Sequence, residues 1–215
     1  HTRLRTVTGV QTCALPICIC NDGALADLDR DGDLDLFLLY REGGNDLLAN
    51  LGDGSFKSIA TQAGIGSDER SPRSVIVGDF DYDRDADILV INESLPHQLL
   101  VNERLWKWRD GTAPGVSSEQ LNDGATAACV VEIADLPLRR AVFAAGNYLR
   151  MPARVQQMPL NRGGELGVAD ADGDGRDDIL LFGADRISMF DEAGRSVRDL
   201  AVPEKSVRTQ LLSLD

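Results

Sequence analysis

Apolar and polar residues follow one repeated pattern along much of the chain. A short apolar stretch precedes nine residues with aspartate at nearly every second position, and a second stretch of Leu, Ile, Val and Phe follows. Three segments align without gaps: ALADLDRDGDLDLFLL from Ala24, IVGDFDYDRDADILVI from Ile76 and GVADADGDGRDDILLF from Gly167. The apolar stretches are too short for helices and are bounded by Gly and Asp, so they predict β-strands.

Further short strands follow each copy. NDLLANLGDGSF, residues 45–56, predicts a strand, a Gly-rich turn and the start of another strand, so one copy supplies about four antiparallel strands. Part of this pattern returns in HQLLVN from His97 and in ISMFDEAG from Ile187. A four-stranded unit that recurs at about 40–50 residues is typical of a propeller blade. The predicted fold is all-β: a partial β-propeller of four-stranded antiparallel blades with Asp-rich hairpin loops.

A degraded copy lies between the second and third copies. VEIADL, residues 131–136, resembles GALADL, residues 23–28, but residues 137–140 replace the acidic loop with PLRR. Asp27, Asp79, Asp135 and Asp170 are then 52, 56 and 35 residues apart. The short last interval indicates a blade that lacks a strand. The final LLSLD, residues 211–215, looks like the opening of another copy, so we expect residues 18–215 to hold about four blades of a propeller truncated at both ends.

The first seventeen residues do not fit the pattern. VTGVQTCALPI, residues 7–17, resembles the translation of a common sequencing adapter, and residues 1–3 fit the adapter's outer end. A signal-peptide remnant is the alternative, but this stretch has no continuous apolar core. We therefore interpret residues 1–17 as an adapter-derived artefact. On this interpretation the natural N-terminus, with any signal peptide, is missing from the sequence.

Composition and charge exclude several classes of protein. No apolar run approaches eighteen residues, so no membrane span is expected. The 22 basic and 35 acidic residues give a net charge of −13, which argues against nucleic acid as a partner. The two histidines, His1 and His97, argue against a zinc cage or histidine-based catalysis. Fifteen of the acidic residues lie in the three Asp-rich windows, so the negative charge of the chain is concentrated there.

The spacing of these aspartates predicts calcium-binding loops. In the first window, Asp27–Asp35, carboxylates at alternate positions converge only if the loop curls around a point. Gly32 at position 6 allows the sharp turn, position 7 offers a backbone carbonyl, and position 9 closes the shell. Oxygen ligands without His or thiolate favour Ca²⁺ over transition metals. We predict two to three calcium sites.

Two other interpretations of the windows fit less well. An EF-hand needs Glu at position 12 and flanking helices, whereas position 12 is apolar in all three copies (Leu38, Val90 and Leu181). Solvated acidic turns are the other alternative, but five carboxylates repeated at one spacing repel each other strongly without a cation. Arg84 stands at position 6 of the second window, where Gly is expected. We predict weaker calcium binding there, because Arg84 is strained in a left-handed turn and its guanidinium, beside Asp83 and Asp85, partly neutralises them.

With these loops the chain resembles the FG-GAP/VCBS repeat family, the calcium-loop propellers of integrin α-chain heads and of many bacterial secreted proteins. The first loop, with residues 45–56 and 63–65, is similar to the bacterial branch related to cartilage acidic proteins. The resemblance covers residues 18–215 and implies a seven-bladed propeller in which the loop joins two strands of a blade. The ligands that it implies are Asp27, Asp29, Asp31, Asp33 (carbonyl) and Asp35; Asp79, Asp81, Asp83, Asp85 (carbonyl) and Asp87; and Asp170, Asp172, Asp174, Arg176 (carbonyl) and Asp178.

Two functions are consistent with the sequence. The leading hypothesis is a secreted or cell-surface binding and adhesion module with structural calcium, because closed metal loops repeat and no catalytic constellation is found. The alternative is the propeller domain of a calcium-dependent polysaccharide lyase. A lyase needs a base opposite a carboxylate-binding site, and no motif places His97, Lys107 and Arg139-Arg140 together.

The expected partner is a protein or a carbohydrate on a face of the propeller. Trp106 and Trp108 would share one strand face and stack on a sugar ring, or pack between blades, and we favour packing. Extracellular calcium modules bind at about 10⁻⁴–10⁻³ M, which is useful only where calcium is abundant. We therefore expect an extracellular, periplasmic or outer-surface protein.

Overall fold

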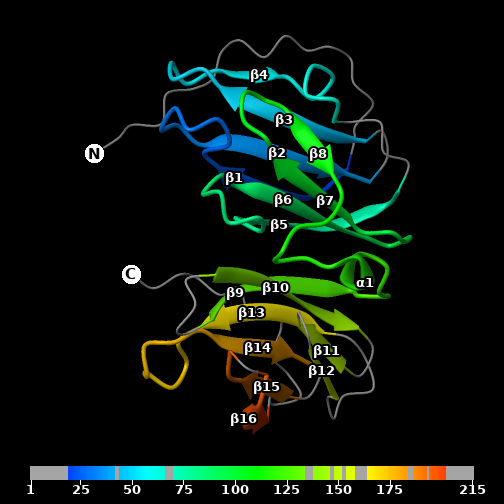
Figure 1. Cartoon of the computed structure of the whole chain (residues 1–215), viewed down its shortest axis with the longest axis vertical. Coiled ribbons are helices and arrows are strands. Elements are labelled where there is room, and N and C mark those ends of the chain that lie inside the picture. The colour runs from blue at the N-terminus through cyan, green and yellow to red at the C-terminus, as the bar shows by residue number, and fades with distance from the viewer. Residues whose placement is uncertain are drawn as a thin grey trace.

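The computed structural model describes residues 19–41, 44–65, 70–133, 138–145, 148–151, 154–157, 164–183, 186–192 and 194–201. These residues form four antiparallel sheets of four strands each, with one short helix (Figure 1). In every sheet, strands that are consecutive in sequence are neighbours in space. The predicted all-β fold of propeller-like blades is confirmed, and the four blades do not close into a ring. Residues 1–17 and Asp135 lie outside the described residues.

The blades follow one another along the chain. The first contains β1 (Cys20–Ala26), β2 (Asp35–Tyr40), β3 (Asn45–Asn50) and β4 (Phe56–Ser58). The second contains β5 (Pro72–Gly78), β6 (Asp87–Asn92), β7 (Gln98–Asn102) and β8 (Trp108–Asp110). After the helix α1 (Ser118–Leu121), the third contains β9 (Ala127–Ile133), β10 (Leu138–Ala145), β11 (Tyr148–Met151) and β12 (Arg154–Gln157). The fourth contains β13 (Glu165–Ala169), β14 (Asp178–Phe182), β15 (Arg186–Phe190) and β16 (Ser196–Ala201).

The third blade corrects one expectation. The short interval between Asp135 and Asp170 indicated a blade with a missing strand, yet the structure pairs β9, β10, β11 and β12 in one sheet. The blade fits into the interval because β11 and β12 have only four residues each and the connections between its strands are short. The length of the interval between repeats therefore does not show how many strands a blade has, because short strands fit a complete blade into a short interval.

Successive blades pack face to face through apolar side chains. In β6, Ile88 and Val90 belong to the apolar cluster shared with the first blade, whereas Leu89 and Ile91 belong to the cluster shared with the third. Side chains of a strand alternate between the two faces of its sheet, so a strand between two neighbours is apolar at consecutive positions. All six residues of β6 are buried, in agreement with this position. A further cluster joins the third and fourth blades through Val142 and other residues.

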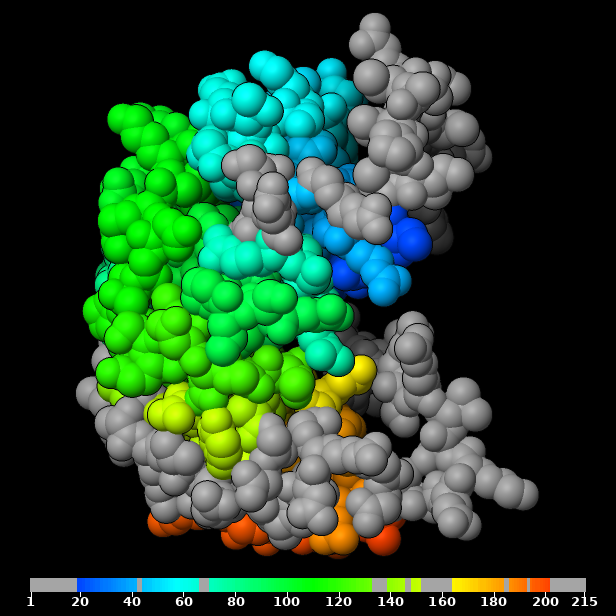
Figure 2. All heavy atoms as spheres, turned by 90° about the vertical axis from the view of Figure 1, so that its right-hand side faces the viewer, coloured from blue at the N-terminus to red at the C-terminus, as the bar shows by residue number. Residues whose placement is uncertain are grey.

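The first strands of neighbouring blades lie next to each other, with β1 against β5, β5 against β9, and β9 against β13. Figure 2 shows the resulting succession of the blades from the N-terminal to the C-terminal part of the described chain. None of the described helices has the length and apolar character needed to cross a membrane.

Candidate metal centres

The three Asp-rich windows form loops that join the first two strands of a blade. We call residues 27–35 the first loop, residues 79–87 the second loop and residues 170–178 the third loop, which lies in the fourth blade. All three extend from the same side of the molecule, on the left in Figure 1. The strands close each loop in one register, with the residue before position 1 opposite position 9: Ala26 with Asp35, Gly78 with Asp87, and Ala169 with Asp178.

The carboxylate at position 1 organises each loop. One of its oxygens accepts the backbone N–H of position 4 and the other accepts the N–H of position 6, at 2.7–3.1 Å. The residues concerned are Asp27 with Arg30 and Gly32, Asp79 with Tyr82 and Arg84, and Asp170 with Gly173 and Gly175. The three copies therefore share one hydrogen-bonded conformation, although their intervening residues differ.

Two residues of each loop lie in the left-handed region. The predicted turn at position 6 has φ of 95° at Gly32, 73° at Arg84 and 84° at Gly175. Sequence reasoning missed the second left-handed turn, at position 4, where φ is 69° at Arg30 and 70° at Tyr82. The glycine at position 4 of the third loop, Gly173, was the sequence feature that could have indicated this turn, and its φ is 80°.

The carboxylate at position 9 is buried and fixed by backbone donors. In each loop it accepts the N–H of position 2, at 2.7–3.0 Å. In the first two blades its second oxygen also accepts the N–H of an asparagine at the end of the third strand: Asn50 donates to Asp35 at 2.9 Å and Asn102 donates to Asp87 at 2.8 Å. Position 9 therefore connects the loop to the body of its blade.

Positions 1, 3 and 9 bring three carboxylates together in every loop. One oxygen from each lies within 4.8 Å of the others in the sets Asp27, Asp29, Asp35; Asp79, Asp81, Asp87; and Asp170, Asp172, Asp178. Calcium binds oxygen at about 2.3–2.6 Å, so two ligands on opposite sides of one ion are about 4.6–5.2 Å apart. The clusters thus have the donor chemistry and the size that fit a calcium ion, which would compensate the charge of the converging carboxylates.

The carboxylates at position 5 lie outside these clusters. Asp31, Asp83 and Asp174 each accept the backbone N–H of position 7. Of the ligands that the resemblance implies, the structure therefore gathers positions 1, 3 and 9. The carbonyls of Asp33, Asp85 and Arg176 at position 7 stay a prediction.

Burial and mutual repulsion change the acidity of the clustered carboxyl groups. Burial raises the pKa of Asp29, and the other carboxylates of the first loop raise it further. The pKa of Asp81 is raised in the same way in the second loop. Burial raises the pKa of Asp87 to about 6, with a further contribution from Asp79 and Asp81. Burial and the neighbouring carboxylates therefore disfavour the ionised form of these groups when no cation is bound.

The arginines that pair with the second loop differ from the one that we predicted, Arg84. We expected the Arg84 guanidinium to neutralise Asp83 and Asp85. Instead, Asp85 is 1% exposed and is paired with Arg30 from the first loop and Arg104 from the connection between β7 and β8. The position of Arg84 next to these residues in the sequence did not show which cations approach Asp85 in space.

A cavity of about 380 Å³ lies beside the first loop. The carboxylates at positions 3, 5 and 7 line one part of it, and Lys57, Gln62 and Trp106 line others. Trp106 precedes β8 and has φ of 62°, so the two tryptophans do not share a strand face and that prediction is wrong. Both pack against the apolar cluster between the first two blades, as the favoured interpretation stated.

The basic residues considered for lyase chemistry do not form a site in the described part of the chain. His97 is 2% exposed, its Nδ1 accepts the N–H of Asn92, and its ring lies against Phe143. Burial lowers the pKa of His97, which disfavours the charged form of the ring. Lys107 precedes β8, whereas Arg139 and Arg140 lie on β10 in the next blade.

Comparison with known proteins supports the repeat and the fold. Residues 27–90, which contain the first two loops, match the family model described as an FG-GAP-like repeat. The predicted resemblance to FG-GAP repeats is confirmed over these residues. No curated protein matches the chain. This chain is also similar to a solved structure of an Agrocybe aegerita lectin, with a TM-score of 0.50 and 18% sequence identity. That structure was solved to explain the specific recognition of non-reducing terminal N-acetylglucosamine by the lectin. The match covers 82% of this chain and 50% of that structure's chain, so the present chain spans about half the length of the lectin structure.

Proposed function

We propose that residues 18–215 are part of a calcium-stabilised β-propeller that serves as a binding module outside the cytoplasm. The observation that carries this proposal is the repetition of one carboxylate geometry in three loops. Positions 1, 3 and 9 would hold a calcium ion in each loop. The ion would supply positive charge that ties the first two strands of a blade together, and the remaining oxygens of its shell would come from the loop backbone or from water.

The repeat supports a location outside the cell, because FG-GAP repeats usually occur in extracellular proteins. Calcium supply supports the same location. A loop with an affinity of about 10⁻⁴–10⁻³ M is occupied only where free calcium is abundant. We therefore propose an extracellular, periplasmic or outer-surface protein.

A carbohydrate is the ligand class that fits the chain best. The cavity beside the first loop combines the indole of Trp106 with an ammonium, an amide and carboxylates. Sugars present C–H groups to aromatic rings and hydroxyls to polar side chains, so this combination suits them. The similarity to a lectin fold agrees with this choice, and a protein ligand is the alternative.

The lyase alternative has less support. Its chemistry requires a base within hydrogen-bond reach of the substrate. His97 is enclosed in the core, and the remaining basic candidates lie on different blades. The binding module is therefore the better proposal.

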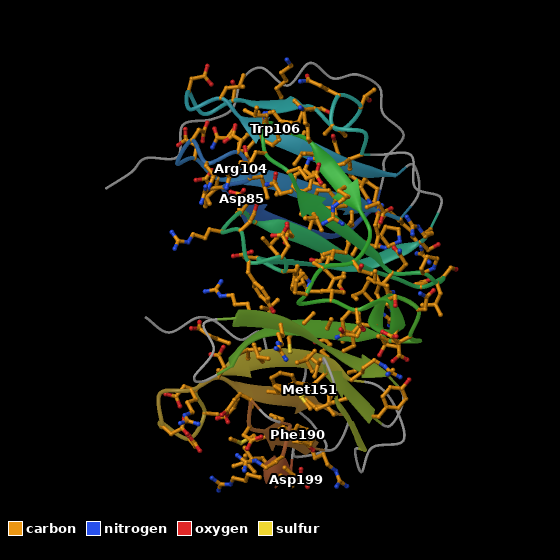
Figure 3. The ribbon with its side chains drawn as sticks, in the orientation of Figure 1. Asp85, Arg104, Trp106, Met151, Phe190 and Asp199 are labelled. Carbon is orange, nitrogen blue, oxygen red and sulfur yellow. The ribbon has the colours of Figure 1, made fainter. Side chains whose placement is uncertain are left out.

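Calorimetric titration with calcium tests the proposal. The chain should bind two to three calcium ions, and the triple variant Asp29→Asn, Asp81→Asn, Asp172→Asn should lose that binding. Asp199→Asn is a matched control, because Asp199 is an exposed aspartate on β16 outside the loops (Figure 3). Calcium binding that survives in the triple variant would refute the loops as sites.

A glycan screen with and without calcium tests the ligand. Calcium-dependent retention of a glycan without chemical change supports the binding module. Release of unsaturated products from a polysaccharide would instead establish the lyase.

A further inference from the structure

Side chains that cross between the first two blades join the first loop to the second. The Nε of Arg30, at position 4 of the first loop, lies 2.8 Å from Oδ1 of Asp85, and an Nη atom of Arg30 donates to the carbonyl of Arg84 at 3.1 Å. The other oxygen of Asp85 accepts a hydrogen bond from Nε of Arg104 at 2.6 Å. Both residues are labelled in Figure 3. One residue of the first loop thus holds positions 6 and 7 of the second.

A second connection runs through Asn102, which is 2% exposed. Its backbone N–H donates to Asp87 at 2.8 Å, and its side-chain amide donates to the carbonyl of Leu28 at 2.7 Å. The N–H of Leu28 in turn donates to Asp35 at 2.9 Å. The position 9 carboxylates of the two loops, Asp35 and Asp87, are therefore linked through one backbone residue and one asparagine.

The third loop provides an internal comparison. Its position 4 is Gly173, which has no side chain that can reach another loop. Its arginine, Arg176, pairs with Glu192 of the same blade at 3.0 Å. Arg176 and Arg30 are similarly exposed, at 50% and 47% of their side-chain surface. An arginine in an Asp-rich loop is therefore present in both cases, but only Arg30 crosses between blades.

We propose that the first and second loops bind calcium cooperatively and that Arg30 and Asn102 carry the coupling. An ion at the first loop fixes the conformation in which Arg30 donates its N–H to Asp27 and Leu28 donates to Asp35. That conformation also fixes the guanidinium of Arg30, which contacts Arg84 and Asp85, and the carbonyl of Leu28, which accepts from Asn102. The second ion then has less of its loop to order, so it binds more tightly.

The coupling must act equally in both directions. An ion at the second loop fixes Arg84, whose N–H donates to Asp79 and whose carbonyl accepts from Arg30. Linkage requires that each ion raise the affinity for the other by the same factor, which we set at about tenfold. This inference rests on the proposed calcium binding.

Nuclear magnetic resonance resolves the three sites individually. The backbone amides of Gly32, Arg84 and Gly175 each donate to the position 1 carboxylate of their own loop, so each should report calcium at that loop. In the unmodified chain, the amides of Gly32 and Arg84 should titrate together with a Hill coefficient above 1. The amide of Gly175 should titrate with a coefficient of 1.

A double-mutant cycle separates coupling from simple electrostatics. Asp29→Asn weakens the first site, and we expect the calcium midpoint at Arg84 to rise about tenfold while the midpoint at Gly175 stays unchanged. In an Arg30→Gln background, Asp29→Asn should lose most of its effect on the second loop. A long-range Coulomb effect of the lost Asp29 charge would persist in that background. Arg176→Gln, the matched control, should leave the effect of Asp29→Asn at the second loop intact.

Each outcome decides one of the two proposals. If no loop amide responds to calcium, the proposed function fails. If all three respond but Asp29→Asn leaves the midpoint at Arg84 unchanged, calcium binding stands and the coupling is refuted. If Asp29→Asn does not fold, the titration of the unmodified chain decides, because coefficients of 1 at both Gly32 and Arg84 would refute cooperativity.

Discussion

The carboxylate of Asp87 accepts the backbone N–H of Asn102 at 2.8 Å, although the two residues are fifteen positions apart. The other oxygen of Asp87 accepts the N–H of Phe80 at 2.7 Å, so the carboxyl group is held inside the blade with no exposed surface. Burial outweighs these two donors and raises the pKa of Asp87 from 3.8 to about 6. A buried carboxyl group with a raised pKa at the proposed site would make calcium binding depend on pH.

Acidification should weaken calcium binding at the second loop. A proton on Asp87 competes with the ion, and a pKa of about 6 means that the carboxyl group is mostly ionised at pH 7 and mostly protonated at pH 5. We expect the calcium midpoint, followed at the amide of Arg84, to rise about tenfold between these two pH values. An equal midpoint at pH 5 and pH 7 would contradict the raised pKa.

The calcium-free protein should show the opposite dependence on pH. Because the folded state raises the pKa of Asp87, this group stabilises the fold fully below pH 3.8, and the contribution disappears as the pH rises through about 6. Its size is at most about 3 kcal/mol. Urea unfolding in a chelator should therefore show a smaller free energy of unfolding at pH 7 than at pH 5. The same pair of measurements on Asp87→Asn provides the control, since the difference attributable to Asp87 should vanish.

Removal of calcium should lower the melting temperature at neutral pH. At about 1 mM calcium and a site affinity of about 0.1 mM, binding stabilises the folded state by about 1.4 kcal/mol per site. For a chain of this size, 1 kcal/mol corresponds to roughly 2–4 °C. Thermal unfolding with calcium and with a chelator should therefore differ by several degrees, and magnesium at the same concentration should restore little of the loss. Coincident melting curves would exclude a structural role for calcium.

The repeat pattern was sufficient to predict the blades and the three loops. Period-two aspartates between apolar stretches determine where the hairpins turn, and the structure closes all three hairpins in one register. The consecutive apolar residues of β6 likewise reflect a strand with a neighbour on each face. These features are local or repeat along the chain, so a sequence reveals them.

Relationships between blades were not predictable in this way. The partners of Asp85 come from Arg30, in another blade, and from Arg104, nineteen residues away, whereas the neighbour Arg84 does not neutralise it. The tryptophans were wrongly assigned to one strand face because the left-handed backbone at Trp106 leaves no clear mark in the sequence. Local chemistry allows several partners for Asp85 and several placements of the tryptophans, and tertiary contacts determine which of them form.

The two tryptophans should respond differently to substitution. Trp106 lines the cavity beside the first loop, whereas Trp108 packs against the apolar cluster but does not line the cavity. We expect Trp106→Ala to abolish retention of a glycan that binds in the cavity, and Trp108→Ala to lower the free energy of unfolding by about 2 kcal/mol while the remaining folded protein binds. Affinity measurements on a hit from the glycan screen, together with urea unfolding, separate the two effects. Undiminished glycan binding by Trp106→Ala would move the ligand site away from the cavity.

Backbone strain at position 6 should set the relative affinities of the second and third loops. Arg84 has φ of 73° and Gly175 has φ of 84°, and a residue with a Cβ is disfavoured in this region by about 1–2 kcal/mol. We expect a calcium-bound loop to need the left-handed turn, because the turn directs the position 6 N–H to the position 1 carboxylate, and we expect the loop to relax when the ion leaves. Arg84→Gly should therefore tighten calcium binding at the second loop about tenfold. The carbonyl of residue 84 is retained, so its contact with Arg30 is preserved.

The reverse substitution in the third loop isolates the strain from the charge of the arginine. A Cβ added at Gly175 meets nothing within 4 Å, so Gly175→Ala changes the backbone preference without creating a clash. It should weaken calcium binding at the third loop about tenfold, and Arg84→Ala, which removes the charge but keeps the strain, should change the second loop much less than Arg84→Gly. The amides of residues 84 and 175 report both affinities in one titration. If Arg84→Ala tightens the second loop as much as Arg84→Gly while Gly175→Ala leaves the third loop unchanged, charge and not backbone strain makes the second site weak.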